Sequence, residues 1–354
     1  MQVFHQVHNR GGERVALDIE SGLQSRGHQV NTVAVKRRDP DGEVAAVVKD
    51  VQVFSEQQKP SNTPLAMLRL FAFLARERPD SVIIHTTAAG FTVAPIAFLL
   101  GIKQRILVHH NAIGTNQDGV WVHLEKLYGT AGVYSDIVFV SDRAHELVAD
   151  WPSRYRKRAE VVFNGIALPE PAPHLDRQKL LERYDLSPDT LLTLSVGSLE
   201  RQKNQKVLVE ALEGVSGAHL FIAGEGSLRS DLERDIKERG SSVTLLGNIE
   251  ISEVSALFRS CDVLLFPSIH EGRALSLLEA ADSGIGIIAS SIPENISVLG
   301  DDGRYVGPHD SAGWRSEIQT LVEDPTEVDE RRRHTKSLSL PSLEEMVDNY
   351  ERLI

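Results

Sequence analysis

The feature that most constrains the fold of this chain is a regular alternation of short apolar runs with longer amphipathic segments. A short apolar run bounded by turn residues is typical of a buried strand, and the amphipathic segments are typical of helices that cover it. This alternation predicts parallel sheets with helices on both faces. In the first half we expect strands at residues 3–7, 30–35, 82–85, 105–109 and 137–140, and a final extended piece at 161–163.

The alternation pauses at residues 168–175, LPEPAPHL, whose three prolines make this stretch the best linker candidate. It then restarts, and the tail from residue 342 predicts a last helix. We therefore predict an α/β fold of two Rossmann-like, doubly wound domains facing a cleft, at residues 1–170 and 171–340, followed by a helical segment at 341–354. Strands of the second half are expected at residues 191–196, 220–223, 243–246, 263–266 and 287–289.

The bulk composition narrows the class of protein. A chain of 354 residues fits two domains, and a net charge of -12 disfavours a nucleic-acid partner. The single cysteine, Cys261, adjoins an apolar run and is expected to be a buried thiol in a cytoplasmic protein. The start of the chain lacks a signal-peptide pattern. Residues 88–102 are apolar, but they are few for a membrane span and include Pro95, so we expect a buried helix.

Ligands of doubly wound sheets bind at the carboxyl ends of the strands, so the residues that follow each strand are the candidates. Gly11 and Gly12 follow the first strand and open a helix, where the backbone can approach a ligand closely; an ordinary glycine turn explains them equally well. His109 and His110 end another strand. Because side chains alternate along a strand, one of them should face the cleft, with a structural histidine as the alternative.

In the second half, Ser198, Arg201 and Lys203 follow the first strand, and a helix is expected over residues 203–213. Cations and backbone N–H groups in this position can bind a diphosphate without metal, although a solvated loop is the commoner outcome. Gly224 and Asn248 follow the next two strands. Their backbone can contact a base or ribose, or they can simply form turns between strand and helix.

The most informative segment is residues 267–280, PSIHEGRALSLLEA, which is predicted to run from strand through loop to helix. Glu271 lies in the loop, and Glu279 lies inside the helix among apolar neighbours. Carboxylates accept hydrogen bonds from vicinal hydroxyls, which suits sugars. The helix start between the two residues can face a phosphate. For Glu279 the alternative is an ordinary surface position, which its apolar neighbours disfavour.

Together these segments resemble the retaining GT-B glycosyltransferases of family 4 (glycosyl transferases group 1), and the resemblance covers nearly the whole chain. It implies transfer of a hexose-type sugar, with retention, from a nucleoside diphosphate to a glycan or glycolipid hydroxyl at the cytoplasmic membrane face. It also implies that residues 341–354 pack back on the first domain. The similar segments are GGER, VHHN, VFNGI, VGSLERQKN, FIAGEGSL, LLGNI and PSIHEGRALSLLEAADSG.

The resemblance also implies roles for residues of the second domain. Lys203 would bind the donor diphosphate, Glu271 the hydroxyls of the donor sugar, and Glu279 the ribose diol. The N–H groups of Leu275 and Ser276 would face the phosphates.

In the first domain, the resemblance places His110 by the anomeric region of the sugar and Gly12 against the phosphates or the acceptor. His110, Lys203 and Glu271 are thus the expected catalytic residues. The family often has arginine where this chain has Ser198. Arg201 is a candidate to replace that charge.

Two other functions fit the same fold. A sugar-nucleotide epimerase would need no acceptor, and a non-catalytic sugar-nucleotide binding module is favoured by the serine at position 198. No metal site is expected, because the Asp39-Pro40-Asp41 sequence is interpreted as a turn. No cofactor is expected either, because the nucleoside-diphosphate sugar is the donor substrate. The basic clusters at residues 36–38 and 154–158 indicate either solvated charge or a peripheral, salt-sensitive contact with the inner membrane face.

Overall fold

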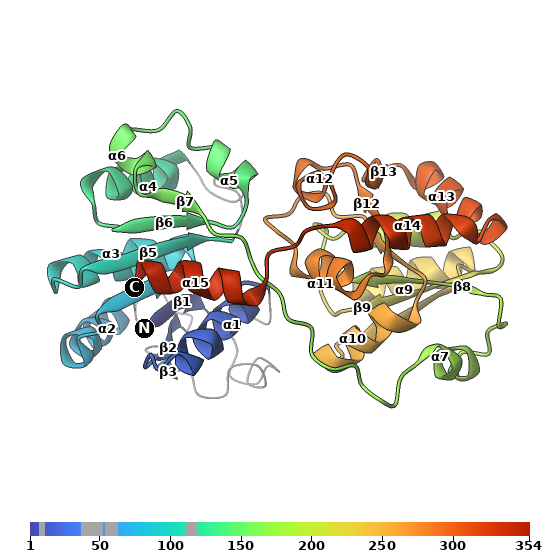
Figure 1. Cartoon of the computed structure of the whole chain (residues 1–354), viewed down its shortest axis with the longest axis horizontal. Coiled ribbons are helices and arrows are strands. Elements are labelled where there is room, and N and C mark those ends of the chain that lie inside the picture. Colours follow the sequence, from blue (N-terminus) through green and yellow to red (C-terminus); the bar gives the residue numbers. More distant parts are fainter. Residues whose placement is uncertain (7–10, 37–51, 54–62, 111–118) are drawn as a thin grey trace. The chain divides into compact units, whose positions relative to one another are not determined.

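The computed structural model describes residues 1–6, 11–36, 52–53, 63–110 and 119–354 (Figure 1). The chain forms two compact units, one of Met1–Gly165 with Pro341–Ile354 and the other of Ile166–Leu340. The division falls a few residues before the boundary expected at 170–171. The reason is local: the Gly165 N–H donates to Met346 Sδ at 3.3 Å, which keeps Gly165 with the first unit.

The first unit contains a seven-stranded parallel sheet in the order β3-β2-β1-β4-β5-β6-β7. The order reverses between β1 and β4, which is where doubly wound sheets bind ligands. The five expected strands are present, and the extended piece expected at 161–163 overlaps the end of β7. Strand β3 was missed because two residues make no recognisable apolar run. The strands are β1 (Gln2–Gln6), β2 (Thr32–Lys36), β3 (Gln52–Val53), β4 (Ser81–Ile84), β5 (Gln104–His109), β6 (Asp136–Phe139) and β7 (Ala159–Val161).

Helices cover both faces of this sheet. The apolar segment around Pro95 forms α3, a helix that buries Val93, Ala94 and Ala97, as the sequence predicted. The helices of the first unit are α1 (Gly11–Ser25), α2 (Thr63–Glu77), α3 (Thr87–Leu99), α4 (Gly119–Ala131), α5 (Asp142–Glu146), α6 (Ser153–Arg156) and α15 (Leu343–Leu353).

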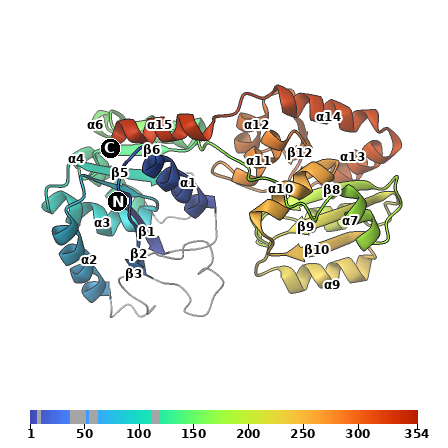
Figure 2. The same cartoon turned by 60° about the horizontal axis from the view of Figure 1, so that its bottom comes forward.

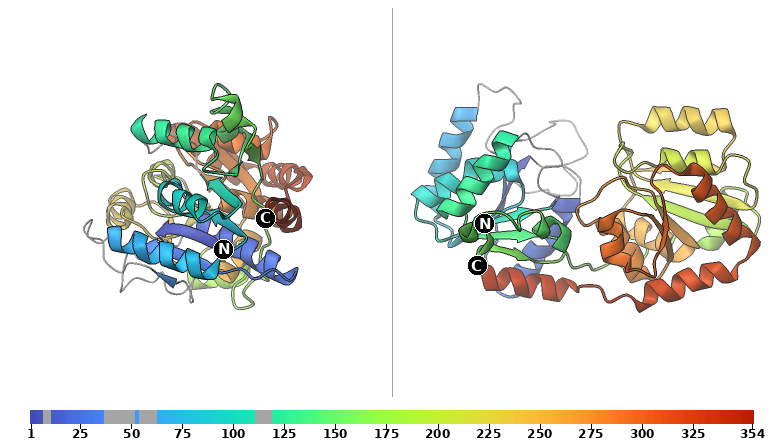
Figure 3. Two further views of the ribbon diagram at one scale, coloured as in Figure 1. Left: turned by 90° about the vertical axis from the view of Figure 1, so that its left-hand side faces the viewer. Right: turned by 90° about the horizontal axis from the view of Figure 1, so that it is seen from above.

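The last helix, α15, packs on α1 (Figures 1 and 3). It begins with a capping box between Ser342 and Glu345, and it buries Met346 and Val347. The packing is close, because a Cβ atom at Gly22 of α1 would lie 2.3 Å from the side chain of Val347.

The second unit contains a six-stranded parallel sheet with the same kind of order, β10-β9-β8-β11-β12-β13, and the reversal lies between β8 and β11. Figure 2 shows the edge strand β10 followed by β9 and β8. Two separate doubly wound sheets confirm the predicted fold class. The edge strand β13 was missed because its first residue is an exposed arginine. The strands are β8 (Leu191–Val196), β9 (Ala218–Ala223), β10 (Val243–Gly247), β11 (Val263–Phe266), β12 (Gly286–Ser290) and β13 (Arg304–Val306).

One apolar core lies on each side of the second sheet, one under α7, α10, α11 and α12 and the other under α8, α9 and α13. Cys261 is buried in the first of these cores, as expected. The helices are α7 (Arg177–Arg183), α8 (Lys206–Ala211), α9 (Arg229–Arg239), α10 (Ile251–Ser260), α11 (Leu275–Ser283), α12 (Pro293–Leu299), α13 (Ser311–Glu323) and α14 (Thr326–Ser337).

The helix expected to start at Lys203 begins instead at Lys206, because Asn204 has a left-handed φ of 53° and belongs to a loop. Within the described ranges, the structure has no helix with both the length and the apolar character that crossing a bilayer requires.

Candidate active site

The centre of the candidate site in the second unit is an ion pair at the reversal of strand order. Lys203 follows β8 and Glu271 follows β11, and their Nζ and Oε1 atoms lie 2.6 Å apart. The side chains are 17% and 6% exposed, so both charges are largely shielded from water. The Lys203 Nζ atom also lies 5.3 Å from the centre of the Phe266 ring. Two residues that the sequence placed at separate strand ends therefore form one charged centre.

Two amide side chains tie the loops that carry this pair. Gln202 Nε2 donates to the His270 carbonyl at 2.9 Å, and the Gln202 carbonyl accepts from the Ile269 N–H at the same distance. Asn204 Nδ2 donates to the Pro308 carbonyl at 2.6 Å. These positioning residues were missed by the sequence analysis. The only available signal was their place in the same loop as Lys203.

Helix α11 starts directly after the loop that carries Glu271. Its N-cap residue, Ala274, has no side-chain oxygen, so no side chain of that residue caps the first N–H groups of the helix. Leu275 and Ser276 supply those groups, which carry the positive end of the helix dipole. Glu279 lies one turn further along and is 9% exposed. The residues predicted to face the phosphates and to bind the ribose thus lie on one helix, α11, which begins after the Glu271 loop.

The remaining predicted residues of the second unit lie at the closely packed ends of β8, β9 and β10. The Gly224 N–H donates to the Gly247 carbonyl at 2.8 Å. Gly224 has a φ of +144°, and a Cβ atom there would lie 2.0 Å from the Gly197 carbonyl oxygen. Glycine is therefore required where β8 and β9 end. The other three predicted residues are exposed at these ends: Ser198, Arg201 and Asn248.

In the first unit, consecutive histidines at the end of β5 point to opposite faces of the sheet, as alternation predicts. His109 is buried, with its Nε2 atom 2.7 Å from the Glu125 carboxylate. His110 lies on the other face, where its Nε2 atom is 3.2 Å from His85 Nδ1. A Cβ atom at Gly12 would lie 3.3 Å from the His110 ring. The structure thus brings the two predicted residues of this unit together, Gly12 and His110.

The surroundings of His85 and His110 keep both rings neutral. Burial, with a smaller contribution from His109, lowers the pKa of His110 to about 4. Burial lowers the pKa of His85 well below its ordinary value, and the neighbouring His110 adds to the effect. At neutral pH both rings therefore offer one donor and one acceptor nitrogen.

The Asp39-Pro40-Asp41 sequence, predicted to form a turn, lies outside the described residues, as do the side chains of the 36–38 cluster. In the ranges that the structure describes, no three histidine, cysteine, aspartate or glutamate side chains gather closely enough to hold a metal ion.

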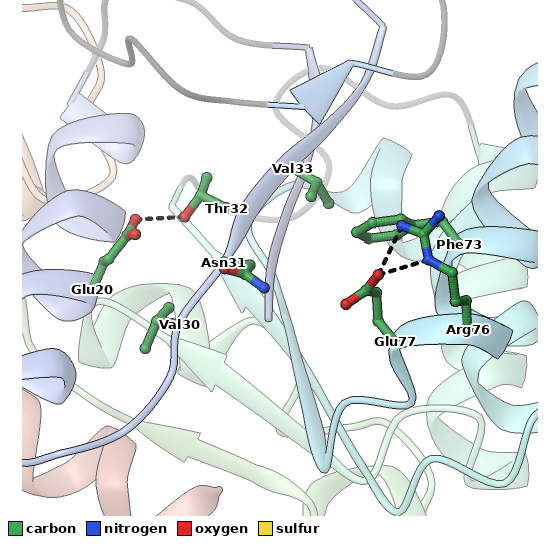
Figure 4. Close-up of a pocket in the computed structure, with 8 residues that line it drawn as sticks. All are labelled: Glu20, Val30, Asn31, Thr32, Val33, Phe73, Arg76 and Glu77. Atoms are coloured by element: carbon green, nitrogen blue, oxygen red, sulfur yellow. Dashed lines mark hydrogen bonds and ion pairs between the residues drawn. The ribbon is translucent and has the colours of Figure 1, made fainter.

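A hollow in the first unit lies at the opposite, amino end of β2 (Figure 4). Four of its polar side chains form two pairs: Thr32 Oγ1 donates to Glu20 at 2.7 Å, and Arg76 donates to Glu77 at 2.9 Å. It is remote from the carboxyl ends of the strands, so it is not the candidate site. It is lined by Glu20, Val30, Asn31, Thr32, Val33, Phe73, Arg76 and Glu77.

Comparison with known families covers both units. The family Glycosyltransferase Family 4 matches residues 9–169, and the family Glycosyl transferases group 1 matches residues 176–337. The chain belongs to the GT-B glycosyltransferases of family 4, as the resemblance of its motifs indicated.

Among curated proteins, an uncharacterized glycosyltransferase of Methanocaldococcus jannaschii is 23% identical over 323 residues, covering 84% of this chain and 81% of the relative. The D-inositol 3-phosphate glycosyltransferase of Pseudarthrobacter chlorophenolicus is 29% identical over 54% of this chain. The O-antigen chain mannosyltransferase RfbU of Salmonella typhimurium is 28% identical over 44%. The chain spans about half the length of the latter two relatives, 49% and 46%.

Among solved structures, HepE of Anabaena in complex with UDP-glucose superimposes with a TM-score of 0.81 at 15% identity, over 100% of both chains. At this level of identity the likeness establishes the shared fold.

Proposed function

We propose that the protein transfers a hexose-type sugar from a nucleoside diphosphate to an acceptor hydroxyl, with retention of the anomeric configuration and without a metal or cofactor. The observation that carries this proposal is the shielded Lys203–Glu271 pair beside the start of α11. A donor of this class carries an anionic diphosphate next to a sugar rich in hydroxyl groups. It thus offers a partner to each member of the pair.

The proposed reaction uses the charges of the second unit. Lys203, Arg201 and the first N–H groups of α11 stabilise the negative charge that develops on the departing diphosphate. Glu271 accepts hydrogen bonds from the donor sugar, and Glu279 accepts them from the ribose. Gly224 and Asn248 contribute the backbone beside the base or ribose. In the first unit, His110 and Gly12 are proposed to approach the sugar and the acceptor.

The relatives support the donor class and the pathway. The superimposed HepE structures are complexes with UDP, with UDP and glucose, and with UDP-glucose, and RfbU is an O-antigen chain mannosyltransferase. We therefore propose a nucleotide-sugar donor and a glycan or glycolipid acceptor, in the synthesis of a cell-surface polysaccharide or glycolipid.

The first experiment identifies the donor by thermal shift with UDP-, GDP-, ADP- and dTDP-sugars, because a ligand that binds the native state raises its stability. Product analysis follows, with the stabilising donor alone and then with glycan and glycolipid acceptors. Transfer to an acceptor with unchanged anomeric configuration supports the proposal. Conversion of the donor alone to another sugar nucleotide favours an epimerase, and stabilisation without turnover favours a binding module.

We further propose that the protein is cytoplasmic and contacts an anionic membrane surface through its first unit. Arg154, Arg156 and Lys157 are exposed there. Among the described residues, the exposed large apolar side chains all lie in the first unit as well: Leu65, Leu68, Phe71, Phe98, Leu99, Val120, Trp121, Leu127 and Leu147.

Exposed apolar and basic side chains on one unit suit a surface that offers acyl chains under anionic head groups. Sedimentation with vesicles of anionic or neutral lipid, at low and high salt, tests this contact. We expect binding to anionic vesicles that weakens as salt rises. Absence of binding at low salt contradicts it.

A further inference from the structure

A stack of three rings crosses the first sheet on the face that carries His110. The Phe4 and His85 rings lie 4.9 Å apart with 14° between their planes, and the His85 and His110 rings lie 5.4 Å apart with 20°. These rings come from β1 and from the ends of β4 and β5. The stack fixes the planes of both histidines, so the remaining freedom is where each ring carries its proton.

Gln2, which is fully buried in β1, determines which ring nitrogen of His85 carries the proton. Gln2 Nε2 donates to the Ala16 carbonyl in α1 at 2.8 Å, which fixes the orientation of the amide. Its Oε1 atom therefore faces His85 Nε2, at 2.5 Å. Because an amide oxygen only accepts hydrogen bonds, His85 must carry a proton on Nε2.

The proton of His110 follows from that of His85. A neutral ring with its proton on Nε2 has an unprotonated Nδ1, which can only accept. That Nδ1 lies 3.2 Å from His110 Nε2, so His110 must be the donor. Neutral His110 then carries its proton on Nε2, and its Nδ1 holds the lone pair. Gly12 leaves room for this ring, because a Cβ atom at position 12 would lie only 3.3 Å from His110 Cδ2.

We propose that Gln2 and His85 are positioning residues that hold His110 as the Nε2–H tautomer, with Nδ1 available to accept a hydrogen bond from a hydroxyl group of the donor sugar or of the acceptor. The assignment of the hydroxyl rests on the proposed function, whereas the tautomer itself does not. A neutral imidazole that could adopt either tautomer would present a donor to that hydroxyl part of the time. The hydrogen bonds that link Gln2, His85 and His110, which we call the relay, remove this alternative.

The tautomer is measured directly by two-dimensional NMR of the full-length protein with ¹⁵N-labelled histidine. Protonated and unprotonated ring nitrogens have different ¹⁵N shifts, and the spectra of His85→Asn and His110→Asn identify the two rings. We expect His85 and His110 both to be neutral at pH 7 with the proton on Nε2. A His110 ring that is charged, or that carries its proton on Nδ1, overturns the proposal. This measurement needs no turnover, so it stands even if the proposed sugar transfer is wrong.

The consequence for activity is tested by Gln2→Glu. A carboxylate beside His85 Nε2 favours the doubly protonated ring. His85 Nδ1 then donates to His110 Nε2, and the proton of His110 moves to Nδ1. With the identified donor and acceptor, we expect kcat to fall by at least about tenfold while the KM for donor changes by less than about twofold. An Nε2–H signal for His110 that persists in Gln2→Glu overturns the relay.

Two further variants separate positioning from folding. His85→Asn keeps an acceptor near the position of Nδ1 and should retain more of kcat than His85→Leu, which has none. His219→Asn is the matched control, because His219 is also buried but lies between the hydroxyls of Ser242 and Thr244 in the second unit. It should leave kcat unchanged. Equal loss in His85→Asn and His85→Leu, with parental melting temperatures, contradicts the positioning role.

Discussion

The two units have the same order of strands around the point of reversal, yet the side chains at that point differ in kind. In the second unit, a cation and a carboxylate meet at 2.6 Å. In the first, two neutral imidazoles meet at 3.2 Å, and burial lowers the pKa of both. The shared topology determines where each site forms, and the side chains determine what it can bind. The charged site suits a diphosphate sugar, and the neutral one suits hydroxyl groups.

Removing the cation of the second unit should have the largest effect on activity. In Lys203→Ala the diphosphate loses its buried donor, and we expect kcat/KM to fall by about 10²–10³-fold. Both kcat and KM should change, because the diphosphate is bound before and after the bond breaks. Steady-state kinetics against donor measure this.

The matched control for Lys203→Ala is Lys206→Ala, because Lys206 is 55% exposed and pairs with Asp235 on the helix that follows. It should keep parental kinetics. Lys203→Arg, which retains the charge, should recover part of the loss. If Lys203→Ala folds like the parent and stays within about twofold of it in kcat/KM, the charged site is not the donor site.

Adding a methyl group where β8 and β9 end close together should have the next largest effect, and this effect is on stability. In Gly224→Ala the new methyl group meets the Gly197 carbonyl at 2.0 Å and the residue keeps a φ of +144°. We expect the free energy of unfolding to fall by about 3 kcal/mol or more. Gly214→Ala is the control, with a φ of +75° and nothing within 4 Å. It should cost about 1 kcal/mol. Equal losses in urea unfolding would show that the contact between β8 and β9 is not close.

The two carboxylates should differ in the kinetic parameter that they change. Glu279 is proposed to bind the ribose, which is remote from the breaking bond, so Glu279→Gln should mainly raise the KM for donor, by roughly 1–3 kcal/mol in binding free energy. Glu271 is proposed to touch the sugar, whose charge changes in the transition state. Glu271→Gln should mainly lower kcat. Kinetics within about twofold of the parent for both variants would refute the assignment of both residues.

The sequence allowed these site residues to be predicted because most of them follow an apolar run. Lys203 and Glu271 each follow an apolar strand, so the rule for parallel sheets was enough to select them. Their direct pairing could not be predicted, because it depends on loops that Gln202 and Asn204 hold together through carbonyls far along the chain. For the same reason, Lys203 was expected in a helix rather than in the loop before it.

In the first unit the prediction stopped at His110. Its partner His85 also follows a strand, but nothing in the sequence shows that β4 lies between β1 and β5. Only that strand order places Gln2, His85 and His110 next to one another. Short edge strands were missed for a different reason. Neither β3, with two residues, nor β13, which begins with an exposed arginine, shows an apolar run.

The smallest expected effect is on the pH dependence of stability. Burial lowers the pKa of His219 to about 4, whereas an unfolded histidine titrates near about 6.5. Between these values the unfolded chain binds more protons, so the free energy of unfolding falls as pH drops through this range. His219→Asn should shrink the difference between pH 7 and pH 5 by on the order of 1 kcal/mol. Urea unfolding at both pH values measures it, with the exposed His174→Asn as control, and an unchanged difference refutes it.

The most direct test of the central claim is a crystal structure of the full-length protein with the nucleoside-diphosphate sugar that stabilises it most. We expect the diphosphate oxygens within hydrogen-bond distance of Lys203 Nζ and of the N–H groups of Leu275 and Ser276. The ribose should lie on Glu279 and the sugar hydroxyls on Glu271. A nucleotide bound away from the ends of β8 and β11, with the Lys203–Glu271 pair intact and uncontacted, would contradict the assignment of the donor site.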